Sequence, residues 1–225
     1  MGLINANVII SGWNGKMGQK VRTLAPSYFS GKCWDGTQLE NEEIKKLKPC
    51  VWIDFSHASL VNSVIAWTQK IQCPLISGTT NLSQEQLQQL EKLSQQIPVI
   101  YDTNFSVGIH LLRILIKKLP QLSDFDISIL ESHHITKQDR PSGTAKTLLK
   151  DLQATQGADK PIEVLSHRGG GIRGEHHVIL SGKNEILSLK HEALDRSIFA
   201  EGALKAAVWS LQKSFGLFSM EDVLI

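Results

Sequence analysis

Short apolar runs alternate with helical patterns through the first half of the chain, and this alternation constrains the fold more than any other feature. The apolar runs cover residues 7–11, 51–55, 74–77 and 98–101. Apolar side chains recur at helical spacing in segments beside these runs, at residues 17–24, 60–68 and 83–96. Strands that alternate with helices predict a parallel, doubly wound sheet. Ligands of such sheets bind beyond the carboxyl ends of the strands.

A glycine-rich turn follows the first apolar run. Gly12, Gly15 and Gly18 lie between a strand pattern and a helix pattern, which is the context of a dinucleotide-binding turn. Asn14 stands where glycine is common, so a tight turn without a ligand stays an alternative. The residues that would contact the nucleotide here are Gly12, Asn14, Gly15, Lys16 and Met17.

A dinucleotide site also needs a partner for the ribose, usually an acidic residue about 20 positions after the turn. Asp35 is the best-placed acid, although the strand pattern before it is weak. Lys16 and Lys32 add positive charge that could meet a 2′-phosphate. The sequence therefore predicts NADH or NADPH as the cofactor without choosing between them.

The chain changes character after Asn104. One long apolar helix pattern covers residues 107–119, and the last one covers residues 198–211. Strand patterns occupy residues 125–130, 162–165, 177–180 and 185–189, and the segment 181–184 is typical of a hairpin turn. This half therefore predicts a smaller α+β domain with a mixed or largely antiparallel sheet.

Residues 131–145 carry the densest chemistry of the sequence. His133 and His134 can change protonation near neutral pH, and Lys137 adds a fixed cation. Residues 141–144 (Pro-Ser-Gly-Thr) precede an apolar helix pattern and indicate a helix start, whose free N–H groups attract anions. Each feature alone is explained by polar surface, a solvated charge or a helix cap. Together they predict a site for a small acidic substrate.

The same segment resembles a known family. Residues 131–145 match the pattern Glu-x-His-His-x-x-Lys-x-Asp-x-Pro-Ser-Gly-Thr-Ala of the 4-hydroxy-tetrahydrodipicolinate reductases, formerly called dihydrodipicolinate reductases, at every fixed position. His57 stands where this family often carries arginine. The resemblance covers most of the chain, through residues 12–18, 53–56, 77–80, 104–108, 174–176 and 196–199.

The resemblance implies two domains and an assembly. A Rossmann-like dinucleotide-binding domain would comprise residues 1–106 and 197–225, because the last helix returns to that domain in the family. Residues 107–196 would form the smaller substrate-binding and oligomerisation domain. The family resemblance also implies a homotetramer.

The implied reaction is the NAD(P)H-dependent reduction of 4-hydroxy-tetrahydrodipicolinate to tetrahydrodipicolinate, a step of lysine (diaminopimelate) biosynthesis. His133 would be the general acid, and Lys137 would neutralise charge or hold a carboxylate. Closure of one domain on the other would exclude water. The dicarboxylate substrate would be held by His134, Lys137, Ser142, Gly143 and Thr144. Further cofactor contacts would come from Gly78, Thr79, Thr80, Thr103, Asn104, Phe105, Arg196 and Phe199.

Three alternatives stay open. A metal hydrolase could use the pairs 133–134 and 176–177, but adjacent histidines on a strand point to opposite faces, so we expect no metal. A sensor that binds NAD(P)H without turnover would not need the acid His133. Another two-domain NAD(P)-dependent reductase, such as an aspartate dehydrogenase-like enzyme, would share the first half but not residues 137–144.

Composition excludes other classes of function. The formal net charge of +2 and the lack of a basic tract argue against nucleic acid as a partner. Three widely spaced cysteines predict reduced thiols in a cytoplasmic protein. No apolar run approaches the ~20 residues that span a bilayer, and the N-terminus lacks the pattern of a signal peptide.

Overall fold

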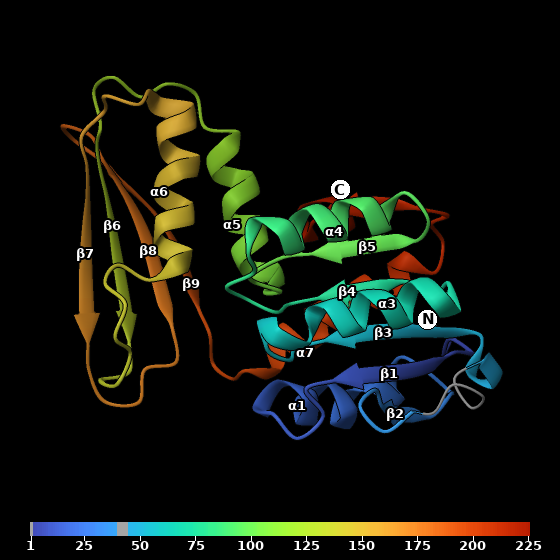
Figure 1. The fold of residues 1–225 in the computed structure, drawn as a ribbon. Helices are drawn as coiled ribbons and strands as arrows, with labels where there is room; N and C mark the ends of the chain where they lie inside the picture. Colours follow the sequence, from blue (N-terminus) through green and yellow to red (C-terminus); the bar gives the residue numbers. More distant parts are fainter. Residues whose placement is uncertain (1, 40–44) are drawn as a thin grey trace. The chain divides into compact units, whose positions relative to one another are not determined.

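The structure of the protein is a computed structural model that describes residues 2–39 and 45–225. The chain divides into two compact units, one formed by residues 1–107 and 197–225 and the other by residues 108–196. The first unit is therefore discontinuous in sequence. Each unit has its own sheet and its own buried core, and the colours of Figure 1 follow the chain through both.

Within the described residues, a six-stranded sheet forms the centre of the first unit. Its strands pair in the order β10-β5-β4-β3-β1-β2, and every pairing is parallel (Figure 1). They are β1 (Asn7–Ser11), β2 (Cys33–Asp35), β3 (Cys50–Asp54), β4 (Leu75–Ser77), β5 (Pro98–Tyr101) and β10 (Gly216–Phe218). The strand order reverses between β1 and β3, so the expected doubly wound, Rossmann-like fold is confirmed.

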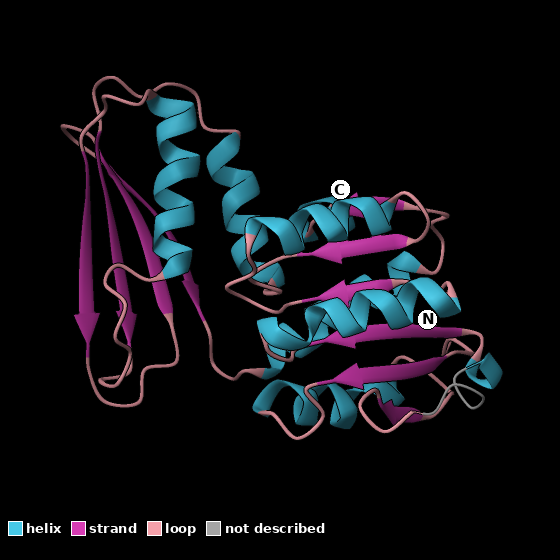
Figure 2. Ribbon diagram, viewed as in Figure 1, coloured by secondary structure: helices cyan, strands magenta, loops and turns pink. Residues whose placement is uncertain are grey.

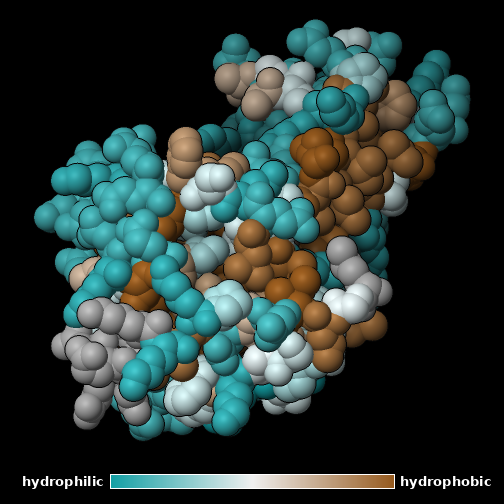
Figure 3. Space-filling view, turned by 90° about the vertical axis from the view of Figure 1, so that its right-hand side faces the viewer, coloured by the Kyte–Doolittle hydropathy of each residue, from teal (hydrophilic) through white to brown (hydrophobic). Residues whose placement is uncertain are grey.

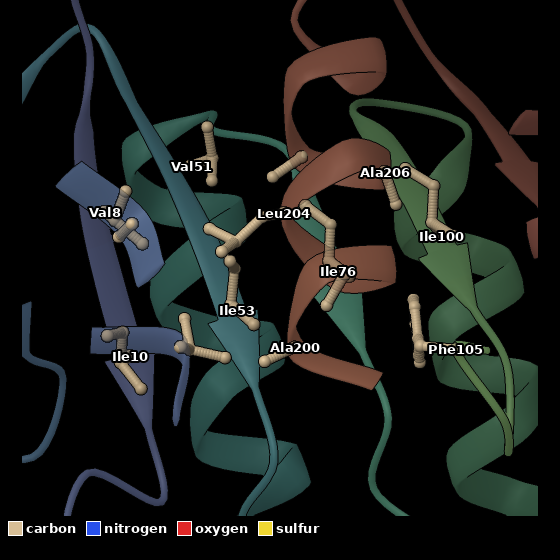
Figure 4. Close-up of a cluster of buried hydrophobic side chains, with 14 of the residues drawn as sticks. Val8, Ile10, Val51, Ile53, Ile76, Ile100, Phe105, Ala200, Leu204 and Ala206 are labelled. Atoms are coloured by element: carbon tan, nitrogen blue, oxygen red, sulfur yellow. The ribbon is translucent and has the colours of Figure 1, made fainter. Parts of the chain in front are cut away.

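Two buried clusters on opposite faces of this sheet account for its helices. Alternate residues of β1 point to opposite clusters, Val8 and Ile10 to one and Ile9 to the other. α7 fills the first cluster, and its small side chains let it pack closely on the strands, as Ala200 and Ala206 show in Figure 4. The helices are α1 (Lys16–Leu24), α3 (Val61–Ile71), α4 (Gln84–Ser94), α7 (Ser197–Ser210) and α8 (Met220–Leu224), with 3₁₀ turns at Ala25–Ser27, Lys45–Leu47 and Ala58–Leu60.

The second unit, all of whose residues are described, is organised around a four-stranded mixed sheet. The strand order is β7-β6-β8-β9, with β6 parallel to β7 and the other pairings antiparallel (Figure 2). The elements are α5 (Val107–Lys117), β6 (Asp126–His133), α6 (Gly143–Gln156), β7 (Ile162–Arg168), β8 (Glu175–Ser181) and β9 (Ile186–Glu192). The two helices cover one face, where Ile129, Val178 and Leu148 are buried together. The expected mixed sheet is confirmed.

Some element boundaries differ from the expected ones. The strand expected at residues 125–130 continues to His133, so this histidine is a strand residue with a defined direction. The sequence patterns missed β10 and α8, because segments of three and five residues are too short to show a period.

The surface carries apolar side chains as well as polar ones. Figure 3 shows one face of the molecule, on which hydrophobic patches lie between hydrophilic side chains. Exposed apolar side chains of the first unit include Leu3, Phe215 and Leu217. Among the residues that the structure describes, no helix is both long enough and apolar enough to cross a bilayer.

Candidate active site

In the described chain, the carboxyl ends of neighbouring parallel strands meet at one edge of the first sheet. The order β5-β4-β3-β1-β2 places the turns that follow these strands along that edge. These turns, together with the end of β2 and the start of α1, contain most of the residues expected to bind the nucleotide, namely Gly12, Asn14, Gly15, Lys16, Met17, Asp35, Gly78, Thr79, Thr80, Thr103, Asn104 and Phe105. We call this edge the nucleotide edge.

The glycine-rich turn after β1 is shaped by close backbone contacts. Gly12 has a φ of +80°, and a Cβ atom there would lie 2.3 Å from the carbonyl oxygen of Phe55. A Cβ atom at Gly18 would lie 2.2 Å from the carbonyl oxygen of Gly12. Glycine is therefore required at both positions by packing alone. Gly15 precedes α1 without a side-chain cap, so the first N–H groups of the helix have no capping side chain, as an anion site requires.

Asp54 ties the turns after β3 and β4 together, and no sequence pattern singled it out. One carboxylate oxygen accepts hydrogen bonds from the Ser56 N–H (3.1 Å) and hydroxyl (2.6 Å). The other accepts from the hydroxyls of Ser77 (3.1 Å) and Thr79 (2.8 Å). The Thr79 hydroxyl is therefore buried and gives its hydrogen to Asp54, so it has no hydrogen left to donate to a nucleotide.

Three residues that were expected to contact the nucleotide have side chains packed in or against the core of the first unit or belong to the second unit. The ring of Phe105 is buried and packs edge-on against Phe55, with the ring centroids 5.7 Å apart. Phe199 lies in α7 and packs against the core cluster of the first unit. Arg196 is the last residue of the second unit, directly before α7.

Asp35 and His57 lie at strand and helix ends of the first unit. Asp35 ends β2 beside Ile10 of β1, and its carboxylate accepts hydrogen bonds from the Thr37 N–H (3.0 Å) and hydroxyl (2.7 Å). His57 precedes the 3₁₀ turn at Ala58–Leu60, and its Nδ1 accepts from the Ser59 N–H at 3.3 Å. His57 therefore acts as a cap, whereas Asp35 keeps the strand-end position that a ribose contact needs.

A buried network of charged side chains lies on the covered face of the mixed sheet. Glu131 and His133 are two residues apart in β6 and point to the same face. The register places Arg168 of β7 beside His133, and His176 of β8 beside Glu131. Glu131 is fully buried, accepts hydrogen bonds from Nη2 (2.8 Å) and Nη1 (3.0 Å) of Arg168, and lies 2.5 Å from Nδ1 of His133.

The guanidinium of Arg168 also holds the loop that follows β6. Its Nε donates to the Lys137 carbonyl oxygen at 3.2 Å, and its Nη2 donates to the Asp139 carbonyl oxygen at 2.5 Å. The ammonium of Lys137 pairs with the Asp139 carboxylate at 2.7 Å. The loop that carries the expected cation is therefore fixed by a buried arginine.

Ser142 caps α6 and joins it to the network. Its hydroxyl accepts a hydrogen bond from the Ala145 N–H (3.2 Å) and lies 3.2 Å from Nε2 of His176. Its N–H donates to Glu131 at 3.3 Å. The expected substrate residues Gly143 and Thr144 form the first turn of α6, next to this cap.

The two neighbouring histidines have different surroundings. Nε2 of His133 faces Gly174, where a Cβ atom would lie 3.2 Å away, so the glycine leaves room beside this nitrogen. The ring of His176 packs edge-on against that of His133 at a centroid distance of 5.2 Å. His134 lies just beyond β6, and its Nδ1 is 2.7 Å from the Thr136 hydroxyl rather than in the Glu131 network.

Burial and charge set the protonation of the network. Burial raises the pKa of Glu131, but hydrogen bonds from Arg168, Ser166 and His133 outweigh it and hold the pKa at about 2. Burial lowers the pKa of His133, and the Glu131 carboxylate partly offsets it. Burial, then the charges of His133 and His191, lower the pKa of His176 to about 3. A permanent carboxylate therefore stands beside two histidines that favour the neutral form.

Metal chemistry has no visible ligand set in the described part of the chain. Within residues 2–39 and 45–225, no group of three or more histidine, cysteine, aspartate or glutamate side chains is arranged to hold an ion. His133 and His176 lie on the covered face of the sheet, and His134 and His177 follow them in sequence and lie elsewhere.

Three members of the network had no role in the sequence-based hypothesis. Glu131 belongs to the matched pattern, but its alternation with His133 was the only signal that the two side chains share a face. Arg168 and His176 are far from residue 131 in sequence, and only strand register brings them to it. The register of a mixed sheet is not visible in a single sequence, so these partners could not be found from it.

Family models match both halves of the chain. Residues 34–105 match the model described as "Dihydrodipicolinate reductase, N-terminus", and residues 108–224 match "Dihydrodipicolinate reductase, C-terminus". The 4-hydroxy-tetrahydrodipicolinate reductase of Rickettsia rickettsii is 35% identical over 234 aligned positions, which cover 96% of this chain and 98% of the relative. The enzyme of that name from Exiguobacterium sibiricum is 41% identical over 186 positions, which cover 76% of this chain and 75% of the relative.

A solved structure shares the fold. The dipicolinate-bound dihydrodipicolinate reductase from Paenisporosarcina sp. TG-14 aligns with a TM-score of 0.79 and 21% identity, over 97% of this chain and 99% of that one. At 21% identity this likeness shows the fold alone, and family membership rests on the sequence relatives and the family models. Because family models match most of its length and its relatives align over nearly all of it, the chain belongs to the dihydrodipicolinate reductase family.

Proposed function

We propose that the protein reduces 4-hydroxy-tetrahydrodipicolinate to tetrahydrodipicolinate with NADH or NADPH, in lysine (diaminopimelate) biosynthesis. The observation that carries this proposal is the network of the second unit, in which His133 is held by a buried carboxylate. A cation at Lys137 and a helix start at Gly143 follow it within a few residues. The named relatives that align over nearly the whole chain support the same reaction.

His133 is the proton donor in this reaction. The conversion removes water and adds one hydride and one proton, and NAD(P)H supplies the hydride when bound. Since Nδ1 of His133 is engaged with Glu131, the transferable proton sits on Nε2, on the side of Gly174. Burial holds the pKa of His133 low, and a bound dianion raises it. The histidine therefore becomes protonated as the substrate binds.

The carboxylates of the substrate bind beside the start of α6. The first turn of this helix contains no acidic residue, and its N–H groups favour an anion. Gly143 and Thr144 supply these groups, with Ser142 as the cap that fixes their direction. Lys137 adds the fixed positive charge, and His134 contributes a further donor beyond β6.

The nucleotide edge fits a dinucleotide. α1 has no acidic residue in its first turn and no side-chain cap, so its start suits a pyrophosphate. Asp35 suits the ribose hydroxyls, and the exposed Lys16 suits a 2′-phosphate. Gly78, Thr80, Thr103 and Asn104 follow β4 and β5 on the same edge and would line the nicotinamide end. Because both signs of charge are present, we infer that the protein uses both cofactors.

The open face of the mixed sheet supports a homotetramer. Leu130 and Leu165 are register partners on the face that α5 and α6 leave uncovered, and Leu165 is exposed. Ile179 lies on the same face of β8. We infer that copies of the chain pack through this face, and that Leu165→Glu lowers the mass measured by sedimentation. An unchanged mass would place the interface elsewhere.

The protein acts in the cytoplasm. Its three cysteines are free, and Cys50 and Cys73 are buried, as expected for a reducing compartment where nicotinamide nucleotides are available. Dicarboxylate substrate and nucleotide are the small-molecule partners, with no part for nucleic acid or a membrane.

The test is a coupled assay with freshly generated substrate. Purified protein with pyruvate, aspartate semialdehyde and the preceding condensing enzyme should consume NADH or NADPH, and a planar pyridine-2,6-dicarboxylate should inhibit competitively. Folded protein that consumes neither cofactor would reject the proposal in favour of a sensor. Oxidation of aspartate with NAD would instead support the aspartate dehydrogenase-like alternative.

A further inference from the structure

We infer that the buried Glu131–Arg168 ion pair is a positioning unit, which sets the geometry of three groups of the proposed substrate site. This inference rests on the proposed reaction. The three groups are His133 in β6, Lys137 in the following loop and Ser142 at the start of α6. They belong to different elements, and each is bonded to the same ion pair.

Glu131 sets the direction of His133. Its Oε2 lies 2.5 Å from Nδ1 of His133, and its pKa of about 2 keeps it ionised. A carboxylate can only accept, so Nδ1 of His133 carries a hydrogen at every pH near neutrality. Nε2 is then the nitrogen that gains and loses a proton. The other oxygen of Glu131 accepts from the Ser142 N–H, which fixes the cap of α6 to the same group.

Arg168 sets the position of Lys137. All three of its guanidinium nitrogens donate hydrogen bonds. Nη1 and Nη2 donate to Glu131. Nε donates to the carbonyl oxygen of Lys137, and Nη2 donates in addition to the carbonyl oxygen of Asp139. Nη1 donates in addition to the carbonyl oxygen of His167. A lysine ammonium carries the same charge but cannot span these acceptors, because it is a single donor centre. Charge and geometry can therefore be separated by substitution.

A second ion pair of the same unit provides a matched control. Nε of Arg113 lies 2.6 Å from Asp151 Oδ2, and Nη2 lies 3.3 Å from Oδ1, so α5 and α6 are joined by two hydrogen bonds. The side chains are 19% and 10% exposed, so this pair is also largely buried. It contributes to folding, but it is not part of the network around His133.

The first experiment tests Glu131 through protonation. In the wild-type protein, ¹⁵N NMR of the histidine rings should show neutral His133 with its hydrogen on Nδ1. Glu131→Gln removes the charge that raises the pKa of His133, so the limb of the kcat–pH profile that reports His133 should move to lower pH by about one unit. Asp151→Asn should leave the limb in place, even if it lowers the melting temperature.

The second experiment tests Arg168 through the loop. Arg168→Lys keeps the charge beside Glu131 but releases the Lys137 loop. KM for the substrate and Ki for pyridine-2,6-dicarboxylate should then rise roughly tenfold, the size of one charge-assisted hydrogen bond, while KM for the cofactor stays unchanged. Arg113→Lys is the matched control and should alter neither constant in the folded fraction.

The outcomes separate this inference from the proposed reaction. An inactive wild-type protein would overturn both. If the wild-type protein were active but its neutral His133 carried the hydrogen on Nε2, the positioning role of Glu131 would be overturned. This measurement uses the wild-type protein and needs no variant to fold. If Arg168→Lys and Glu131→Gln each lowered activity by a factor that did not depend on pH or on substrate concentration, the ion pair would serve folding alone.

Discussion

The two units prepare their binding surfaces by different means. At the nucleotide edge, backbone does most of the shaping: Gly12 and Gly18 let a turn and a helix approach, and the Thr79 hydroxyl is turned inward to Asp54. On the covered face of the mixed sheet, side chains shape the site, since the Glu131 carboxylate lies within hydrogen-bond distance of His133 and Arg168 donates to Glu131. Single substitutions in the second unit should therefore act on chemistry, and those at exposed positions of the first unit should act weakly.

The sheets of the two units also differ in which of their faces are covered. β3 is buried at every residue because both faces of the parallel sheet are covered, so it leaves no side chain for a site and only its ends can bind ligands. β8 alternates between buried and half-buried residues, and its buried face, which the helices cover, carries the polar His176 in line with the apolar Val178 and Leu180. The covered face of the mixed sheet thus carries polar side chains within its strands, not only at their ends.

The largest expected effect is at His133. His133→Ala removes the proposed proton donor, so kcat should fall by roughly 10²–10⁴-fold, the usual range for a general acid. Binding of NADPH, followed by fluorescence, should stay the same because the nucleotide edge belongs to the other unit. An unchanged kcat would mean that water or His134 supplies the proton.

A somewhat smaller loss is expected at Lys137. Lys137→Ala removes the cation that we propose to face the substrate dianion, which should cost about 2–4 kcal/mol in kcat/KM, by analogy with other electrostatic contacts to a transition state. Lys146→Ala, an exposed cation one turn into α6, is the control. Equal losses in both variants would show that net charge matters rather than the place of Lys137.

Acid should weaken the second unit more than the first. The pKa of His176 is about 3 in the folded protein and about 6.5 in the unfolded protein. Below pH 6.5 the unfolded state therefore binds more protons than the folded state, and the free energy of unfolding decreases as the pH is lowered. At pH 5 the loss is about 2 kcal/mol, at 1.36 kcal/mol per pH unit. All five tryptophans and only one of the eight histidines lie in the first unit. The protection factors of β6 and β8 amides, which correct for the slower intrinsic exchange in acid, should therefore fall at pH 5 before tryptophan fluorescence changes.

His176→Phe should remove most of that acid sensitivity, whereas His177→Gln, on the less buried face of the same strand, should keep it. Equal sensitivity in both variants would assign the effect to His133 or His191, whose pKa values burial also lowers.

Cofactor preference should respond weakly, because it depends on exposed charges of the first unit. In the proposed site Asp35 would favour NADH and Lys16 would favour NADPH, so the two kcat/KM values should differ by less than about a hundredfold, or 2.7 kcal/mol. Asp35→Ala should shift the ratio toward NADPH, and Lys16→Ala toward NADH. Ratios that stay the same in both variants would show that the ribose lies elsewhere on the edge.

The smallest expected effect is a gain. The Asp139 carboxylate pairs with Lys137, so a substrate carboxylate must replace it there. Asp139→Asn should lower KM by at most about fivefold, because a partly exposed ion pair contributes about 0.2–1 kcal/mol. The carbonyl oxygen that binds Arg168 is kept in this variant. A higher KM would mean that the Asp139 carboxylate orients Lys137 instead.

Sequence patterns were sufficient for the fold and for part of the site. Alternating strands and helices predicted the parallel sheet, and its topology places the turn at Gly12 beside the turns after β3 and β4. Local signals also predicted a helix start within residues 141–144, where Ser142 caps α6. The partners of His133 stayed hidden because Arg168 and His176 reach it only through strand register. Asp54 stayed hidden because a buried carboxylate in an apolar strand has no periodic signature.

The discontinuity of the first unit has a consequence for synthesis on the ribosome. β1, β3, β4 and β5 are made early, but α7, which covers one face of their sheet, belongs to residues 197–225. The second unit is continuous from residue 108 to 196, so all of its residues emerge while the first sheet still lacks this helix. The strands of the first sheet therefore lack the cover of α7 while residues 108–196 are made, and exposed apolar surface of this kind makes an incomplete chain prone to aggregate. The first unit is therefore begun first and completed last during synthesis.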